Sequence, residues 1–311
     1  MVQDDEQGMP AGGNDAEAVM AAREHAARRV SFLKMLGPGV LIAAAAVGAS
    51  HLVQSTRAGA DFGFQLLWLV LLANAMKYPF FEFGQRYSAA TGRTLLHGYR
   101  QLGRGYLAAF LIVSLIGMVM SISALTFFTA ILAGNLFEMA FGITLGENGA
   151  FWWSVIVIVV CDGILLRGRY RTLDLIIKGI VAVLGVTAVT AAVAAFLNQP
   201  EAADVAVRAA GAADRPGTPW TLASLGFLIA LMGWMPAPIE LSAWTGVWMR
   251  EREEQTGYRP TVREALIDFN TGYIATIILS TAFLSLGALV MHPSGQSFEA
   301  AGPAFCDQLV G

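Results

Sequence analysis

Two short stretches place polar or ligand-type side chains inside segments that are otherwise apolar. The first is VGAS followed by His51, and the second is GWMPAPIE, which contains Met235 and ends at Glu240. Imidazole and thioether groups suit transition metals, whereas backbone carbonyls and carboxylates bind harder cations. The candidate cation ligands are the backbone carbonyls of Gly48 and Met232 and the side chains of Ser50, His51 and Met235, with Ala237 beside them and charge supplied by Glu240.

Each of these residues also has a purely structural interpretation. His51 could be a hydrogen-bonded histidine between helices, and Met235 could be ordinary apolar packing. Glu240 could form an ion pair that locks two helices, with Lys77 as its candidate partner. Lys77 either snorkels to the cytoplasmic surface, pairs with that carboxylate, or places its ammonium where a coupling ion would bind.

The composition identifies the environment of these groups. The chain has 311 residues, of which 56% are hydrophobic and 14% charged, and its mean hydropathy is +0.57. Such a composition is typical of a membrane protein. Enzyme signatures such as a phosphate-binding loop, a nucleophile elbow or a His-Glu-x-x-His pair do not occur in the sequence. We therefore expect no enzyme activity, no cofactor and no nucleic-acid partner, and membrane lipids and a transported ion as partners.

Seven apolar segments are candidates to cross a hydrocarbon layer about 30 Å thick, which takes about 20 helical residues. Arg and Lys cluster in the connections on one side of these segments, and only Arg57, Arg208 and Arg215 fall on the other side. This asymmetry predicts a cytoplasmic N-terminus in the plasma (inner) membrane. The segments lie near residues 36–60, 64–85, 105–138, 151–166, 172–197, 221–248 and 265–291.

The two polar stretches interrupt the first and the sixth of these segments. Gly48 weakens the first helix, and Pro236 and Pro238 each remove a backbone donor from the sixth. Five segments separate the starts of the two breaks, and an odd number of crossings inverts the second copy. This pattern is typical of inverted-repeat transporters, which bind their solute where two discontinuous helices meet. The alternative is that both breaks are packing kinks.

Four stretches of the chain resemble the NRAMP family of divalent-metal transporters: LGPGVLIAAAAVG, ADFGFQLLWLVLLANAMKYPF, GRYRTLDLIIKGIVAVL and MGWMPAPIELSAW. The resemblance implies an all-α membrane protein with a LeuT-type inverted-repeat fold and unwound first and sixth helices. It also implies a secondary active transporter that moves a divalent metal cation by alternating access. The alternatives are a transporter of the same fold for an organic or uncharged solute, and a transport-inactive membrane sensor or scaffold.

The metal-binding motifs of the family are altered in this chain. Its first-helix motif, Asp-Pro-Gly-Asn, falls on residues 48–51, so the anionic ligand is missing. Its Met-Pro-His motif in the sixth helix keeps the methionine as Met235 but has Ala237 in place of the histidine. The acidic residues of its proton route in the third helix correspond to Ile122 and Leu125. We therefore expect a divergent, NRAMP-related member.

The resemblance also suggests how the chain is organised. We expect a disordered cytoplasmic tail over residues 1–30 and a first five-helix repeat over residues 31–197. An extracytoplasmic linker over residues 198–219 would then lead to two helices of the second repeat over residues 220–311. This second repeat is incomplete, so we expect a C-terminally truncated fragment or a chain that needs a partner.

Overall fold

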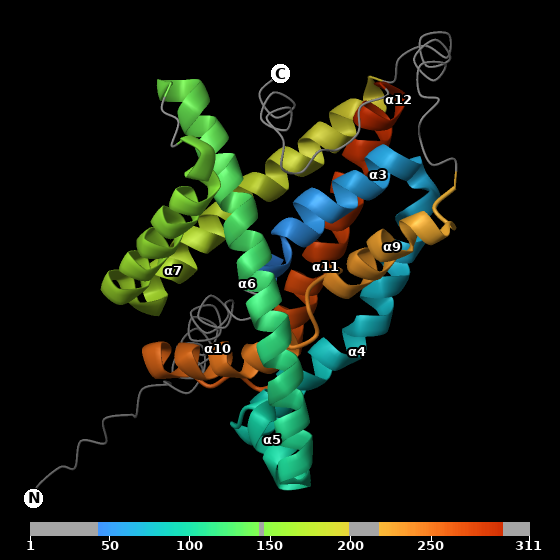
Figure 1. Cartoon of the computed structure of the whole chain (residues 1–311). Helices are drawn as coiled ribbons and strands as arrows, with labels where there is room; N and C mark the ends of the chain where they lie inside the picture. Colours follow the sequence, from blue (N-terminus) through green and yellow to red (C-terminus); the bar gives the residue numbers. More distant parts are fainter. Residues whose placement is uncertain (1–42, 143–145, 199–217, 295–311) are drawn as a thin grey trace, which may run out of the picture.

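The computed structural model describes residues 43–142, 146–198 and 218–294. The expected tail over residues 1–30 and most of the expected linker over residues 198–219 lie outside the described residues. Within the described ranges every regular element is a helix (Figure 1), as the apolar segments predicted. Five helical stretches in these ranges are long and apolar enough to cross a membrane.

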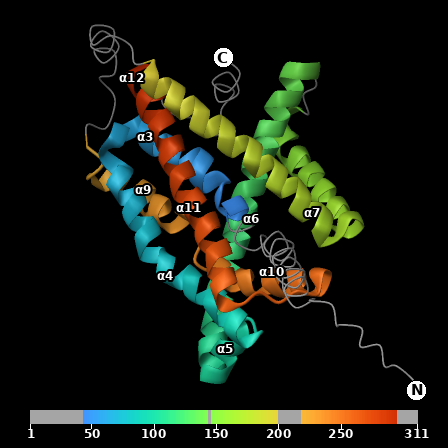
Figure 2. The ribbon, with the colours of Figure 1, turned by 180° about the vertical axis from the view of Figure 1, so that it is seen from behind.

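The first two expected segments form a helical hairpin. Its elements are η1 (Ala49–Ser55), α3 (Thr56–Phe62), η2 (Gly63–Leu66) and α4 (Leu67–Thr91). The chain turns at Gly63, whose φ of 59° lies in the left-handed region that glycine adopts without strain. The hairpin thereby places both α3 and α4 against α11 (Figure 2).

The middle of the chain forms two long outer helices and one short helix. These are α5 (Leu95–Leu102), α6 (Arg104–Phe141) and α7 (Gly149–Leu197), with η3 (Gly146–Asn148) before α7. The ribbon of α7 folds back on itself in both views (Figures 1 and 2), and its halves Gly149–Arg167 and Gly179–Leu197 are each apolar enough to span a membrane. The fourth and fifth expected segments are therefore the two arms of α7.

The last part of the described chain contains the split sixth segment and the seventh. Its elements are α9 (Leu222–Trp234), α10 (Leu241–Thr256), α11 (Val262–Leu286), η4 (Gly287–Met291) and α12 (His292–Ser294). The expected helix over residues 221–248 is thus two helices separated by an unwound stretch. The start of α11 is defined by a capping box, in which Thr261 and Glu264 satisfy each other's backbone N–H groups.

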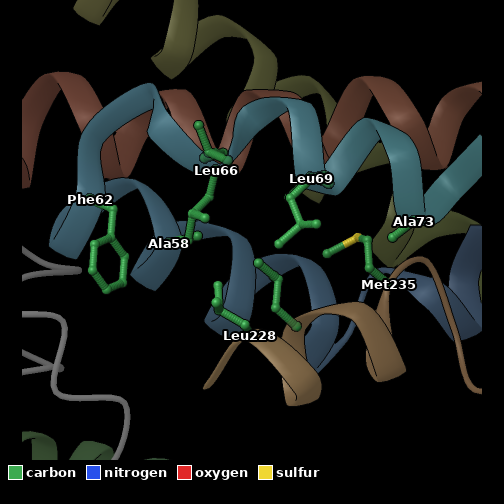
Figure 3. Packing of buried hydrophobic residues seen from close by; sticks show 10 residues of the cluster. Ala58, Phe62, Leu66, Leu69, Ala73, Leu228 and Met235 are labelled. Atoms are coloured by element: carbon green, nitrogen blue, oxygen red, sulfur yellow. The ribbon is translucent and has the colours of Figure 1, made fainter. Parts of the chain in front are cut away.

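An apolar cluster joins the hairpin to α9 and α11. Leu69, Leu228 and Met235 pack against one another across the elements (Figure 3). The backbone of α3 also lies close to the end of α11 and the start of η4: a Cβ atom on Gly59 would collide with the carbonyl oxygen of Leu284 and the backbone nitrogen of Ala288. This packing fixes the broken first and sixth segments against α4 and α11.

Candidate functional site

The first break lies where Gly48 was expected to interrupt the helix. A helical turn over residues 43–46 ends in a turn at Val47 and Gly48, and the wider π-helical turns of η1 follow. The N–H of Leu52 donates to the carbonyl of Gly48 at 3.0 Å, so the chain recovers helical hydrogen bonding within one turn. Single π-helical turns of this kind are rare and frequently occur at functional sites.

His51 bridges the first break and α11. Its side chain is completely buried, with Nδ1 2.6 Å from the carbonyl oxygen of Ala46 and Nε2 2.9 Å from that of Thr276. Ser50 Oγ donates to the same Ala46 carbonyl and lies 2.9 Å from His51 Nδ1. Both ring nitrogens are therefore occupied by protein groups. A metal ion that used this imidazole would have to displace one of the two carbonyls.

The second break is the unwound stretch between the end of α9 at Trp234 and the start of α10 at Leu241. Pro236 and Pro238 lie within it, and the Met235–Pro236 peptide bond is cis. The ammonium of Lys77 reaches this stretch from α4. It donates to the carbonyl of Gly233 at 2.6 Å and to that of Ala237 at 3.1 Å. One cation thus bridges a carbonyl in the last turn of α9 and a carbonyl within the unwound stretch.

The two breaks lie side by side. Ser50 Oγ in the first break is 3.2 Å from the carbonyl oxygen of Pro236 in the second. On the other side of the second break, Met235 is fully buried in the apolar cluster with Leu69 and Ala73, and Met232 packs against that cluster (Figure 3). The thioether of Met235 therefore lies among apolar side chains.

A cavity of about 290 Å³ lies beside the two breaks, between them and α6. Most of its lining is apolar, and its polar groups are the hydroxyls of Ser50 and Ser121 and the carboxylate of Glu240. Ile122 and Leu125, at the positions that correspond to the family's proton route, also line it. Of the expected site residues, the structure brings together Gly48, Ser50 and Glu240 at this cavity, and His51, Met232, Met235, Ala237 and Lys77 lie outside its lining.

Glu240 is the charged group of this cavity. Only 7% of the residue is exposed, and none of the described residues donates a hydrogen bond to its carboxylate or forms an ion pair with it. Lys77 interacts with the carboxylate electrostatically, without a direct contact. The carboxylate lies over Gly117 of α6, where a Cβ atom would come within 2.6 Å of Oε1. Because glycine has no side chain, this position leaves space for the carboxylate.

Sequence reasoning pointed to Ile122 and Leu125 of α6 but missed Gly117 and Ser121 of the same helix as contributors to the site. Gly117 and Ser121 are four residues apart in a largely apolar helix, so they share one face of α6. Small residues at this spacing typically mark a close helix–helix contact in membranes. This signal was present in the sequence, although it does not identify which helix approaches.

The fold and the site together define an integral membrane protein with two discontinuous helices that meet beside a cavity. Residues 39–305 match the family model of the natural resistance-associated macrophage protein-like (Nramp) proteins, so the chain belongs to the Nramp family. The family match confirms the resemblance expected from the sequence.

Relatives and a solved structure show how the chain compares with other members. It is 39% identical to the uncharacterized protein PM0681 of Pasteurella multocida over 88% of this chain and 60% of that protein. It is 31% identical to the divalent metal cation transporter MntH of Verminephrobacter eiseniae over 55% of this chain and 38% of that protein. The chain therefore spans less than two thirds of the length of these relatives.

The structure is similar to that of the Eremococcus coleocola manganese transporter, with a TM-score of 0.54 and 17% sequence identity. The match covers 83% of this chain and 52% of that transporter. This similarity confirms the expected transporter fold. The low identities to the transporters agree with the expectation of a divergent member.

Proposed function

We propose that this protein is a secondary active transporter that moves a divalent metal cation across the membrane by alternating access. The observation that supports this most directly is the contact between the two breaks at Ser50 and Pro236, beside a cavity that holds the buried carboxylate of Glu240. Discontinuous helices that meet at a cavity are the usual position of an ion site in such transporters. The metal as cargo is inferred from the MntH relatives.

The oxygen atoms at the cavity are the ligands we propose for the ion. Ser50, Glu240 and the backbone at Gly48 supply hydroxyl, carboxylate and carbonyl oxygen, which suit hard cations. His51 and Met235, as soft ligands, would have to give up their present contacts before they bound a metal. We therefore assign the first contact with the ion to the oxygen groups and retain the two soft groups as ligands of a rearranged state.

We assign to Lys77 the role of charge compensation at the second break. The C-terminal end of α9 carries the negative end of the helix dipole, and its carbonyls need a donor. The Lys77 ammonium supplies both a positive charge and two hydrogen bonds there. It thus occupies a position that a coupling cation occupies in other transporters with broken helices.

Metal uptake into proteoliposomes tests this function. We expect saturable Mn²⁺ or Mg²⁺ uptake by the purified protein, and about a tenfold or greater loss in Glu240→Gln because a charged ligand is removed. Glu82→Gln is the matched control, since that carboxylate pairs with Arg86 on α4 and is not part of the cavity lining. The absence of uptake by the unmodified protein for both ions would contradict metal transport and favour a sensor or scaffold. Equal uptake by the Glu240→Gln variant would contradict the assigned site.

A further inference from the structure

We propose that the Glu240 cavity also binds small organic monocations of the alkylammonium or guanidinium type, in competition with the metal ion. This inference shares the cavity with the proposed function but depends on different observations. They are the chemistry of the cavity wall, the charge that faces it and its size.

The wall of the cavity also suits an organic cation. Two indoles, Trp234 and Trp244, line it together with Met118, and aliphatic side chains from α6 and α10 complete the wall. A divalent metal ion bound here would keep several water ligands, because the cavity supplies only a few oxygen atoms. The indole rings can stabilise the charge of an alkylammonium ion by cation–π attraction, and the aliphatic side chains can cover its alkyl groups.

The charge at the cavity suits a monovalent cation. Glu240 contributes one negative charge, and the described residues contain no group of three or more His, Cys, Asp or Glu side chains that could hold a metal ion. A monocation matches this single negative charge, so the pair carries no net charge in apolar surroundings, where a net charge is costly.

The size of the cavity limits the guest. A volume of about 290 Å³ is at the lower end of the range for small-molecule sites, roughly 300–1,000 Å³. Guanidinium and tetramethylammonium are both much smaller than a drug-sized molecule and fit this limit. The close approach of Gly117 positions the carboxylate at the wall of the cavity, so the charged end of such a guest has a defined partner.

Calorimetric titration of the purified, metal-free protein with guanidinium chloride and tetramethylammonium chloride tests the inference. We expect saturable binding of both ions, weakened about tenfold to a hundredfold in Glu240→Gln because a charge-assisted contact is lost. Trp244→Leu should weaken tetramethylammonium binding several-fold, since an indole stabilises an alkylammonium ion. Glu82→Gln should bind like the unmodified protein. Urea, which matches guanidinium in shape but has no charge, should not bind.

The outcomes separate this inference from the proposed function. No saturable binding of either organic cation would overturn the inference, even if metal uptake proceeds. Binding of organic cations without metal uptake would support the inference and contradict the proposed function. Competition in the unmodified protein provides a readout that needs no variant: Mn²⁺ should displace guanidinium, and independent binding of the two would overturn the shared cavity.

Discussion

The two breaks satisfy their unpaired backbone groups in different ways. Each leaves backbone groups without helical partners inside a segment that crosses the membrane, where unpaired groups are expensive. The first break recovers its hydrogen bonds within its own sequence, through π-helical turns and the side chains of Ser50 and His51. The second break stays unwound and depends on Lys77, whose ammonium donates to Gly233, 156 positions later in the chain.

This difference assigns separate roles to the two breaks. The first is anchored to α11 by the completely buried imidazole of His51, which contacts two carbonyls. It can therefore serve as a fixed wall of the cavity. The second is held by a flexible, half-buried lysine stem, and its last residue carries the carboxylate of the cavity. We therefore expect the second break to respond to bound cations and the first to determine stability.

His51→Leu should have the largest effect on stability. It removes a buried imidazole that contacts the carbonyls of Ala46 and Thr276, and the loss of a buried hydrogen bond with its partner left in place costs about 1–3 kcal/mol. We expect the free energy of unfolding to fall by about 1–3 kcal/mol, measured by thermal or denaturant unfolding in detergent.

The exposed His97 provides the matched control for this experiment. His97→Ala on α5 should change the unfolding free energy by less than about 0.5 kcal/mol, as exposed substitutions generally do. If His51→Leu were equally mild, the first break would not depend on its histidine and the contrast between the two breaks would fail.

The positions of both breaks could be predicted from the sequence because their causes are local. Pro236 and Pro238 remove backbone donors wherever they lie, and Gly48 weakens a helix in any context. The all-α class and most of the membrane-crossing segments followed from apolar length in the same way.

The directions of the side chains could not be predicted, since they depend on packing. The π-helical turns rotate the residues that follow Gly48 away from ideal α-helical positions, and His51 consequently contacts α11. Met235 points into an apolar cluster because Leu69 and Ala73 of α4 surround it. Lys77 donates to backbone carbonyls and does not contact Glu240, and the spacing of these residues along the sequence could not predict this.

Lys77→Met should lower stability by an intermediate amount and strengthen cation binding. Loss of two charge-assisted hydrogen bonds from a half-buried ammonium should lower the unfolding free energy by about 1–2 kcal/mol. Removal of a positive charge near Glu240 should strengthen cation binding, by about tenfold. Calorimetric titration with Mn²⁺ and guanidinium measures this change, and Lys77→Arg is the control that keeps the charge. Weaker binding in Lys77→Met would show that the ammonium helps to form the site instead of opposing the guest.

Ser50→Ala should have the smallest effect and measures how strongly the two breaks are coupled. The hydroxyl has one proton, which it donates to the carbonyl of Ala46, so its contact with the Pro236 carbonyl at 3.2 Å is the weaker of the two. We expect a loss of about 0.5–1.5 kcal/mol for the single variant. In a double-mutant cycle with Lys77→Met, the interaction energy should stay below about 0.5 kcal/mol, because the two substitutions affect different carbonyls. A larger interaction energy would mean that the breaks share one hydrogen-bond network, and a cation that moved the second break would then move the first as well.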